Sequence, residues 1–182
     1  MVMMQWYNEP PQWKLENSML TVTTGAKTDF WRTTHYGFIR DDGHFYYQTA
    51  EGDFVFTTQF TGQYRNLYDQ AGVMLRVDEQ NWIKCGVEFV EGVQQASVVV
   101  TRQFSDWSVT PLPQNPPTIW LKVKRSGDAV EVFYSLDGSH YTLLRLAYLP
   151  PDKPVQVGIM CASPQGAGFT VHFDHFQLTT AE

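Results

Sequence analysis

The sequence predicts an all-β protein built as a sandwich or a barrel. Alternating or β-branched segments recur along the chain, for example at residues 57–60, 98–101 and 119–124, and such segments suit a half-buried pleated sheet. No long stretch keeps the 3.6-residue period of an amphipathic helix. Turn sequences separate the expected strands at short spacing, which is typical of sandwiches and barrels. They are Asp41-Asp42-Gly43, Glu51-Gly52-Asp53, Glu91-Gly92, Ser126-Gly127-Asp128 and Asp137-Gly138-Ser139.

The composition favours one folded domain over residues 1–182. Hydrophobic residues make up 43% of the chain and charged residues 18%, whereas disordered chains combine low hydrophobicity with high net charge. A net charge of -6 without a long basic block argues against a nucleic-acid partner. No apolar run approaches the roughly 20 residues of a membrane span, and we expect neither a signal peptide nor a membrane partner. We interpret residues 111–117, which are rich in proline, as a crossing between sheets.

The two cysteines predict buried free thiols. Cys85 and Cys161 lie in apolar, strand-like runs without a second thiol nearby in sequence. Disulfides form in oxidising compartments, so we expect a cytoplasmic protein. A disulfide or a reactive thiol is the alternative.

The middle of the chain predicts its own strand pairing. Apolar residues occupy the odd positions of 71–77 and again of 82–90, and since side chains alternate along a strand, both sets should face one core. A three-residue loop at Glu79-Gln80-Asn81 and a turn at Gly92-Val93 keep them on one face. On the other face, this register puts Arg76 opposite Lys84, Lys84 beside Thr101, and Glu88 beside Gly72.

That other face is a candidate binding site, because it is polar and is flanked by Gln70 and Trp82. Two cations opposite each other destabilise a sheet by up to about 1 kcal/mol unless an anion lies between them. Glu88 is about 13 Å from Lys84 along the strand, so we expect the anion to be Asp69, Asp29 or a bound acidic or hydroxyl-rich ligand. The alternative is an ion-pair lattice on a solvent-exposed sheet.

Several motifs resemble the "regulation of enolase protein" family. They are Thr28-Asp29-Phe30-Trp31-Arg32, Leu67-Tyr68-Asp69-Gln70-Ala71-Gly72-Val73-Met74 and Trp82-Ile83-Lys84-Cys85-Gly86-Val87-Glu88-Phe89. This family comprises domains of unknown function with the concanavalin A-like lectin/glucanase fold, and the resemblance covers nearly the whole chain. It implies a jelly roll of two curved antiparallel sheets, with ligands held on the concave face. The polar face derived from the register would be that concave face.

The sequence lacks the carboxylate pattern of the catalytic members of that superfamily. In the retaining glycosidases of that superfamily, two catalytic carboxylates project from one strand with the pattern Glu-x-Asp-x-x-Glu. In this sequence Glu88 and Glu91 are three residues apart, so they point to opposite faces. An enzyme would therefore need Glu88 together with Asp69 or Asp29. No nucleophile elbow, phosphate loop or zinc motif occurs. We expect no cofactor, and no metal at residues 172–175, whose His and Asp side chains do not converge from one strand.

The leading hypothesis is a non-catalytic domain that binds a carbohydrate or a sugar-like polar ligand, with Arg76 and Lys84 favouring an acidic one. Sugar sites combine aromatic platforms with groups that form hydrogen bonds. The candidate platforms are Trp31, Trp82 and Trp107, and the candidate polar residues are Asp29, Gln59, Asp69, Gln70, Arg76, Lys84, Glu88 and Thr101. Two alternatives are a glycan-active enzyme that uses Glu88 and a protein-interaction module in carbohydrate metabolism.

Overall fold

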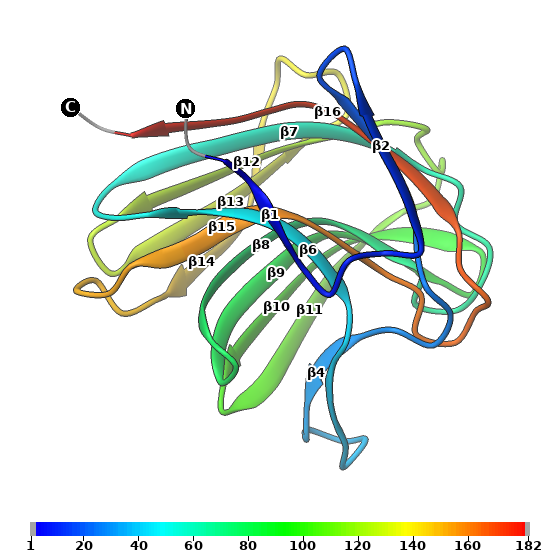
Figure 1. The fold of residues 1–182 in the computed structure, drawn as a ribbon, viewed down its shortest axis with the longest axis horizontal. Helices are drawn as coiled ribbons and strands as arrows, with labels where there is room; N and C mark the ends of the chain where they lie inside the picture. Colours follow the sequence, from blue (N-terminus) through cyan, green and yellow to red (C-terminus); the bar gives the residue numbers. More distant parts are fainter. Residues whose placement is uncertain (1–2, 181–182) are drawn as a thin grey trace.

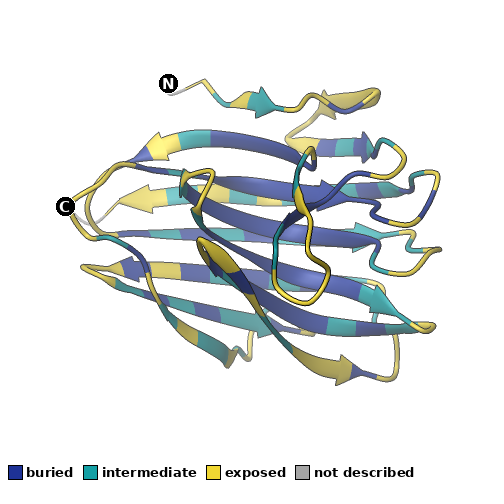
Figure 2. Ribbon diagram, turned by 90° about the horizontal axis from the view of Figure 1, so that it is seen from below, coloured by how far each residue is buried: buried dark blue, intermediate teal, exposed yellow. Residues whose placement is uncertain are grey.

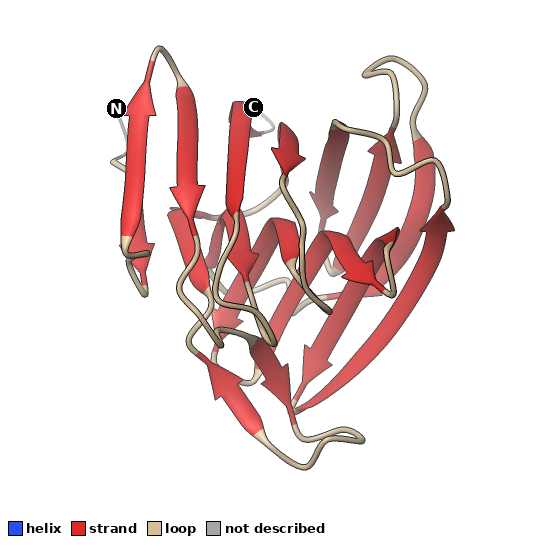
Figure 3. Ribbon diagram, turned by 90° about the vertical axis from the view of Figure 1, so that its right-hand side faces the viewer, coloured by secondary structure: helices blue, strands red, loops and turns tan. Residues whose placement is uncertain are grey.

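The computed structural model describes residues 3–180 and confirms the all-β prediction, because strands and loops account for that whole range (Figure 3). Two antiparallel sheets of seven strands pack face to face, and a short hairpin lies outside them (Figure 1). Sheet A contains, in spatial order, β1 (Gln5–Tyr7), β6 (His44–Ala50), β15 (Val155–Ala162), β8 (Gln70–Asp78), β9 (Asn81–Val90), β10 (Val93–Arg102) and β11 (Phe104–Leu112). Sheet B contains β14 (Thr142–Tyr148), β13 (Ala129–Ser135), β12 (Ile119–Ser126), β7 (Phe54–Gly62), β16 (Thr170–Thr180), β3 (Met19–Thr23) and β2 (Gln12–Glu16).

The strand order is that of a jelly roll, in which segments far apart in sequence lie side by side. In sheet A, β15 inserts between β6 and β8 and pairs antiparallel with both. The proline-rich segment leads from the end of β11 in sheet A to β12 in sheet B, as predicted. Within residues 3–180, no helix has the length and apolar character needed to cross a membrane.

The apolar core lies between the two sheets and consists of buried strand residues, which are coloured dark blue in Figure 2. The odd-numbered residues of β8 and β9 face it, as the alternation predicts. Phe54, Phe56 and Phe60 are fully buried, whereas Phe89 is only half-buried and stacks on Tyr64 with 6.1 Å between ring centroids. Cys85 and Cys161 are free and buried in this core, which confirms the prediction of free thiols.

The predicted strand register is wrong by two residues in both central hairpins. Arg76 lies opposite Trp82, and Lys84 lies opposite Met74. The β8–β9 turn has two residues instead of three, because the Asp78 carboxylate accepts the backbone N–H of Gln80 and closes a tight turn next to a bulge. A shift of two residues keeps every side chain on its predicted face.

The β9–β10 hairpin has the same kind of error. It turns at Glu91 and Gly92, with φ of 51° and 82°, as a two-residue turn with positive φ at both positions requires. Val90 therefore pairs with Val93. Thr101 lies beside Trp82, and Lys84 lies beside Val99 instead of Thr101.

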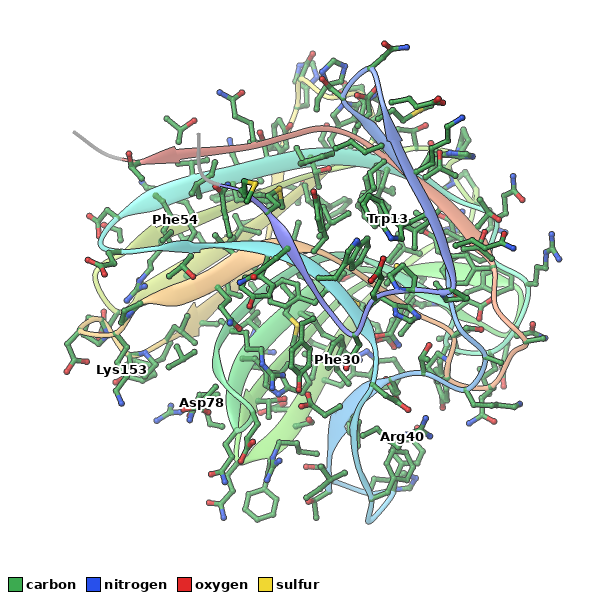
Figure 4. All side chains as sticks on the ribbon, in the orientation of Figure 1. Trp13, Phe30, Arg40, Phe54, Asp78 and Lys153 are labelled. Atoms are coloured by element: carbon green, nitrogen blue, oxygen red, sulfur yellow. The ribbon has the colours of Figure 1, made fainter. Side chains whose placement is uncertain are left out.

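The outer face of sheet A, turned away from sheet B, is itself covered. The hairpin of β4 (Phe30–Arg32) and β5 (Ile39–Asp41) lies against it (Figure 1). Phe30, labelled in Figure 4, lies between this hairpin and sheet A and packs edge-on against Trp82 with 6.2 Å between centroids. A second apolar cluster results, built from Phe30, Trp31, Phe45, Tyr47, Met74, Trp82, Val99 and Met160. The polar residues of this face are thereby enclosed, which excludes a solvent-exposed ion-pair lattice.

Candidate functional site

A cavity of about 60 Å³, called the hairpin cavity below, lies between the β4–β5 hairpin and the outer face of sheet A. Its polar floor consists of Asp29, Gln70, Lys84 and Glu88. Its walls are the aromatic side chains of Trp31, Tyr36, Phe38, Tyr68 and Trp107, and the loop residues Pro164 and Gln165 complete it. The cavity has room for a few water-sized groups.

Lys84 organises the floor and has all three of its N–H donors engaged. Its Nζ donates to the backbone carbonyl of Phe30 at 2.7 Å, to Oε1 of Gln70 at 2.7 Å and to Oδ1 of Asp29 at 3.3 Å. These acceptors come from the residue before β4, from the first residue of β4 and from the first residue of β8. Lys84 therefore ties the hairpin to the sheet.

Glu88 is the least satisfied polar group of the floor. It is 7% exposed, and its polar contacts are the Lys84 ammonium at 3.9 Å and the Ser97 hydroxyl, which leaves acceptor capacity on its two oxygens. Burial raises its pKa to about 7, while Lys84 lowers the pKa, Asp29 raises it, and a hydrogen bond from the Ser97 hydroxyl lowers it. Glu88 thus titrates much closer to neutral pH than an exposed glutamate does.

The prediction that Glu88 cannot reach Lys84 is wrong. Oε1 of Glu88 lies 3.9 Å from Nζ of Lys84. Gly86 is the residue between them on the same face of β9, and it has no side chain to hold them apart. The backbone spacing of about 13 Å is closed because both long side chains lean over this glycine.

The aromatic wall is closed at the top by two tyrosine hydroxyls. Tyr36 at the hairpin tip and Tyr68 before β8 share a hydrogen bond of 2.8 Å, which raises the pKa of Tyr36 to about 12 together with burial. The Trp31 ring meets Tyr36 edge-on at 5.6 Å, and Trp107 meets Tyr68 edge-on at 6.2 Å. The four rings thus form a continuous wall around the polar floor.

The hairpin is held in place by hydrogen bonds from backbone N–H groups at both ends of β4. The Arg32 N–H donates to Oγ of Ser105, which also pairs with the Thr101 hydroxyl at 2.8 Å. The Asp29 N–H donates to Oδ1 of Asp42 at 2.9 Å, which closes the other side of the hairpin. Thr101 is therefore placed beneath the hairpin, where it supports β4, and lies outside the hairpin cavity.

Six of the eleven predicted site residues come together in the hairpin cavity: Asp29, Trp31, Gln70, Lys84, Glu88 and Trp107. The other predicted residues lie elsewhere. Arg76 is paired through both nitrogens with Asp41, at 2.7 and 3.0 Å, and stacks on the Tyr7 ring. The anion that pairs with Arg76 is thus Asp41, whereas the sequence predicted Asp69, Asp29 or a ligand.

Asp69 is fully buried, and its carboxylate accepts hydrogen bonds from other residues of the protein. Its Oδ2 accepts the backbone N–H groups of Arg65 and Asn66, and its Oδ1 accepts the Ser163 hydroxyl at 2.6 Å. These bonds fix the loop before β8. Of the two partners considered for Glu88, only Asp29 therefore shares the cavity with it.

Trp82 and Gln59 are also outside the cavity. Trp82 does face away from the main core, as predicted, but it is 1% exposed beneath Phe30, and its Nε1 donates to the Glu79 carbonyl. Gln59 lies on β7 in sheet B, opposite Trp120 and Asp174. Neither ring face of Trp82 is open to a ligand.

Sequence reasoning missed Tyr36, Phe38 and Tyr68. The segment 30–38 is dense in aromatic residues around a tight tip, where Thr33, His35 and Gly37 have φ of 64°, 64° and 74°. Tyr68 stands directly before Asp69 and Gln70 in a motif that was considered. Clusters of aromatic residues next to turn residues are the sequence signal that could have identified these three residues.

A metal centre finds no support in the part of the chain that the structure describes. No three His, Cys, Asp or Glu side chains in residues 3–180 are placed to hold a metal ion. His172 hydrogen-bonds to Thr21, and His175 contacts the neighbouring Asp174 at 3.7 Å. The side chains of residues 172–175 thus have other contacts.

Comparisons with known proteins agree with the fold and with the family resemblance. The chain is 37% identical over 174 residues to "Regulation of enolase protein 1" of Saccharomyces cerevisiae, covering 96% of this chain and 88% of that protein. A crystal structure of a functionally unknown protein from Saccharomyces cerevisiae superposes with a TM-score of 0.94 at 36% identity, over 98% of this chain and 97% of that one.

More distant structures share the fold alone. A GH43 protein from Bacillus licheniformis matches with a TM-score of 0.74 at 15% identity, over 98% of this chain and 37% of that one. The carbohydrate binding module CBM66 from Bacillus subtilis matches with a TM-score of 0.61 at 13% identity, over 98% and 97% of the two chains. The family model described as "Protein of unknown function (DUF1349)" matches residues 6–181, and the chain therefore belongs to that family.

Proposed function

We propose that this protein binds a carbohydrate or a sugar-like polar ligand in the hairpin cavity. The observation that carries the proposal is the combination of four aromatic rings with a buried polar floor. A sugar ring presents apolar C–H faces, which pack on aromatic side chains, and hydroxyls, which bond to carboxylate and amide groups. Glu88 is the floor residue with free hydrogen-bonding capacity for such a hydroxyl.

The surroundings of the cavity support a ligand larger than the cavity itself. A shallow groove of about 650 Å³ adjoins it and shares Trp31, Tyr36 and Trp107 with it. One substituent of a sugar ring would enter the hairpin cavity while the ring and the rest of the ligand lie along the groove. The shared fold with a carbohydrate binding module gives further support.

Tryptophan fluorescence tests the proposal, since Trp31 and Trp107 line the cavity. Titration with monosaccharides and short oligosaccharides at millimolar concentrations should give a saturable change for one class of sugar. Trp107→Ala should abolish this change. Trp13→Ala should retain it, because Trp13 lies on β2 in sheet B, 39% exposed and remote from the cavity (Figure 4).

Two results would contradict the proposal: no sugar alters the fluorescence, or Trp107→Ala binds as the wild type does. Failure of every sugar would favour a protein-interaction module instead.

A hydrolytic role is the second candidate. Asp29 and Glu88 contact the same Lys84 nitrogen at 3.3 and 3.9 Å, so their nearest oxygens lie at most about 7 Å apart, a limit that admits the carboxylate separation of a retaining glycosidase and the lower end of the inverting range. The raised pKa of Glu88 suits a general acid. Turnover of a bound glycan that is lost in Glu88→Gln would establish this role, and binding without turnover would leave the binding function alone.

We also propose that the protein is cytoplasmic. Its two thiols are free and buried in the core, as expected where disulfides do not form. Fluorescence microscopy of the tagged protein tests the location, and a secreted protein would contradict it.

A further inference from the structure

The cationic side chains on the outer face of sheet A are already committed. All three N–H donors of Lys84 are used by Phe30, Gln70 and Asp29. Arg76 is held by Asp41 and lies outside the cavity. An acidic ligand would thus meet no free positive donor among the floor residues, and the reason for expecting one disappears.

The carboxylates, in contrast, have unused acceptors that line the cavity. Glu88 has two carboxylate oxygens and only the Ser97 hydroxyl and the more distant Lys84 ammonium beside them, and Phe30 and Lys84 both bond to Oδ1 of Asp29, which leaves its Oδ2 for a ligand. Asp29 and Glu88 together outnumber the single Lys84 ammonium. The floor therefore attracts hydrogen-bond donors and, when Glu88 is ionised, carries a net negative charge.

The walls reinforce this preference. The ring faces of Trp and Tyr attract cations, most strongly where water is excluded. Trp31, Tyr36, Tyr68 and Trp107 surround the floor on which Asp29 and Glu88 lie. A buried carboxylate next to aromatic rings is an environment that a protonated amine satisfies, since it offers several N–H donors and a positive charge at once.

We propose that the hairpin cavity selects a sugar or sugar-like ring that carries a protonated amine, held by Asp29 and Glu88 and enclosed by the four aromatic rings. This inference rests on the proposed function and adds the charge of the ligand. The amine enters the hairpin cavity beside Glu88, and the ring stacks on the aromatic side chains that the cavity shares with the adjoining groove.

Calorimetry at pH 7 with matched sugars tests the inference. D-Glucosamine should bind at least about tenfold more tightly than D-glucose, a difference of about 1.4 kcal/mol. N-Acetyl-D-glucosamine and D-glucuronate should gain nothing over D-glucose, because the first lacks the charge and the second has the wrong sign. Equal binding of D-glucosamine and D-glucose would contradict the proposed preference for a protonated amine, while the proposal that the protein binds sugars would still hold.

Ethanolamine separates the two proposals further, since it carries the amine without the ring. If ethanolamine binds as tightly as D-glucosamine and D-glucose does not bind, the function as a sugar-binding domain fails. If no probe binds, both proposals fail.

Variants test which residues provide the preference. Glu88→Gln and Asp29→Asn should each abolish the preference, so that D-glucosamine and D-glucose bind equally well to the same variant. Glu131→Gln removes a carboxylate from β13 in sheet B and should keep the preference, as a matched control. Circular dichroism establishes that each variant is folded, and a preference that survives in both cavity variants would contradict the assignment.

Discussion

At the residue scale, Glu88 shows how the fold sets the chemistry of a carboxyl group. The same side chain would titrate near 4.5 in an exposed setting, but burial raises its pKa to about 7 even with Lys84 at 3.9 Å. The ammonium does not fully offset the desolvation because its donors point to other acceptors. A buried carboxyl group with few hydrogen-bond donors is costly to ionise. A ligand that donates hydrogen bonds to the carboxylate would reduce this cost.

The pH dependence of stability follows from this residue. Because the folded state holds the Glu88 proton more tightly than the unfolded state, stability falls as pH rises from about 4.5 to about 7 and is level above that. The loss is about 3 kcal/mol on this pKa difference. Urea unfolding between pH 4 and pH 8 should show that Glu88→Gln gains this amount relative to wild type. Parallel curves for the two proteins would contradict the burial of an unpaired carboxyl group.

At the scale of single elements, the β4–β5 hairpin turns a sheet face into a cavity. Its base is fixed by the contacts of Lys84 with Asp29 and Phe30, and the far end of β4 is fixed by the bond from the Arg32 N–H to Ser105. Its tip is joined to the rest of the molecule through the hydroxyls of Tyr36 and Tyr68. A firmly held base and a singly held tip make the tip the part that opens most easily.

Tyr36→Phe should loosen the tip without unfolding the protein. One neutral hydrogen bond contributes about 1 kcal/mol net, so the amides of Thr33 and Gly37, which bond within the tip, should exchange with solvent about fivefold faster. The Arg32 amide should exchange as before. Tyr148→Phe on β14 serves as the control. Unchanged exchange at Gly37 would show that the tyrosine pair does not hold the tip.

At the scale of the whole molecule, stability and the site depend on different buried cations. Arg125 is 1% exposed on β12 and donates to the carbonyls of Pro150, Pro151 and Lys153, which ties down the crossing from β14 to β15. Lys153 lies well away from Phe30 at the hairpin (Figure 4). Arg125 thus holds the two sheets together at an end that the cavity does not use.

Arg125→Met should therefore lower the free energy of unfolding without altering ligand binding. Its removal leaves several buried carbonyls without donors, and we expect a loss of about 3 kcal/mol. Lys124→Met changes the neighbouring exposed side chain and should alter stability by less than about 0.5 kcal/mol. A weakened affinity for sugars in folded Arg125→Met would show that the site and this crossing are coupled.

The sequence was most informative where the signal is local. Alternation assigned the correct face to the residues of β8 and β9, and the turn sequences located five of the connections between consecutive strands. The register failed by two residues because a bulge and two-residue turns depend on backbone geometry that the alternation pattern does not encode. The grouping of Asp29, Gln70, Lys84 and Glu88 survived this error, since a two-residue slip preserves the face.

The sequence by itself determined the fold class, the family and which side chains face away from the main core, because all three depend on patterns along the chain. The tertiary structure decided which of those side chains form a site. Trp82 and Arg76 are covered or paired by residues far away in sequence, Phe30 and Asp41, whereas Tyr36 and Tyr68 join the cavity across 32 positions. Burial and pairing are set by such long-range contacts, and they decide whether a polar or aromatic side chain is free to meet a ligand.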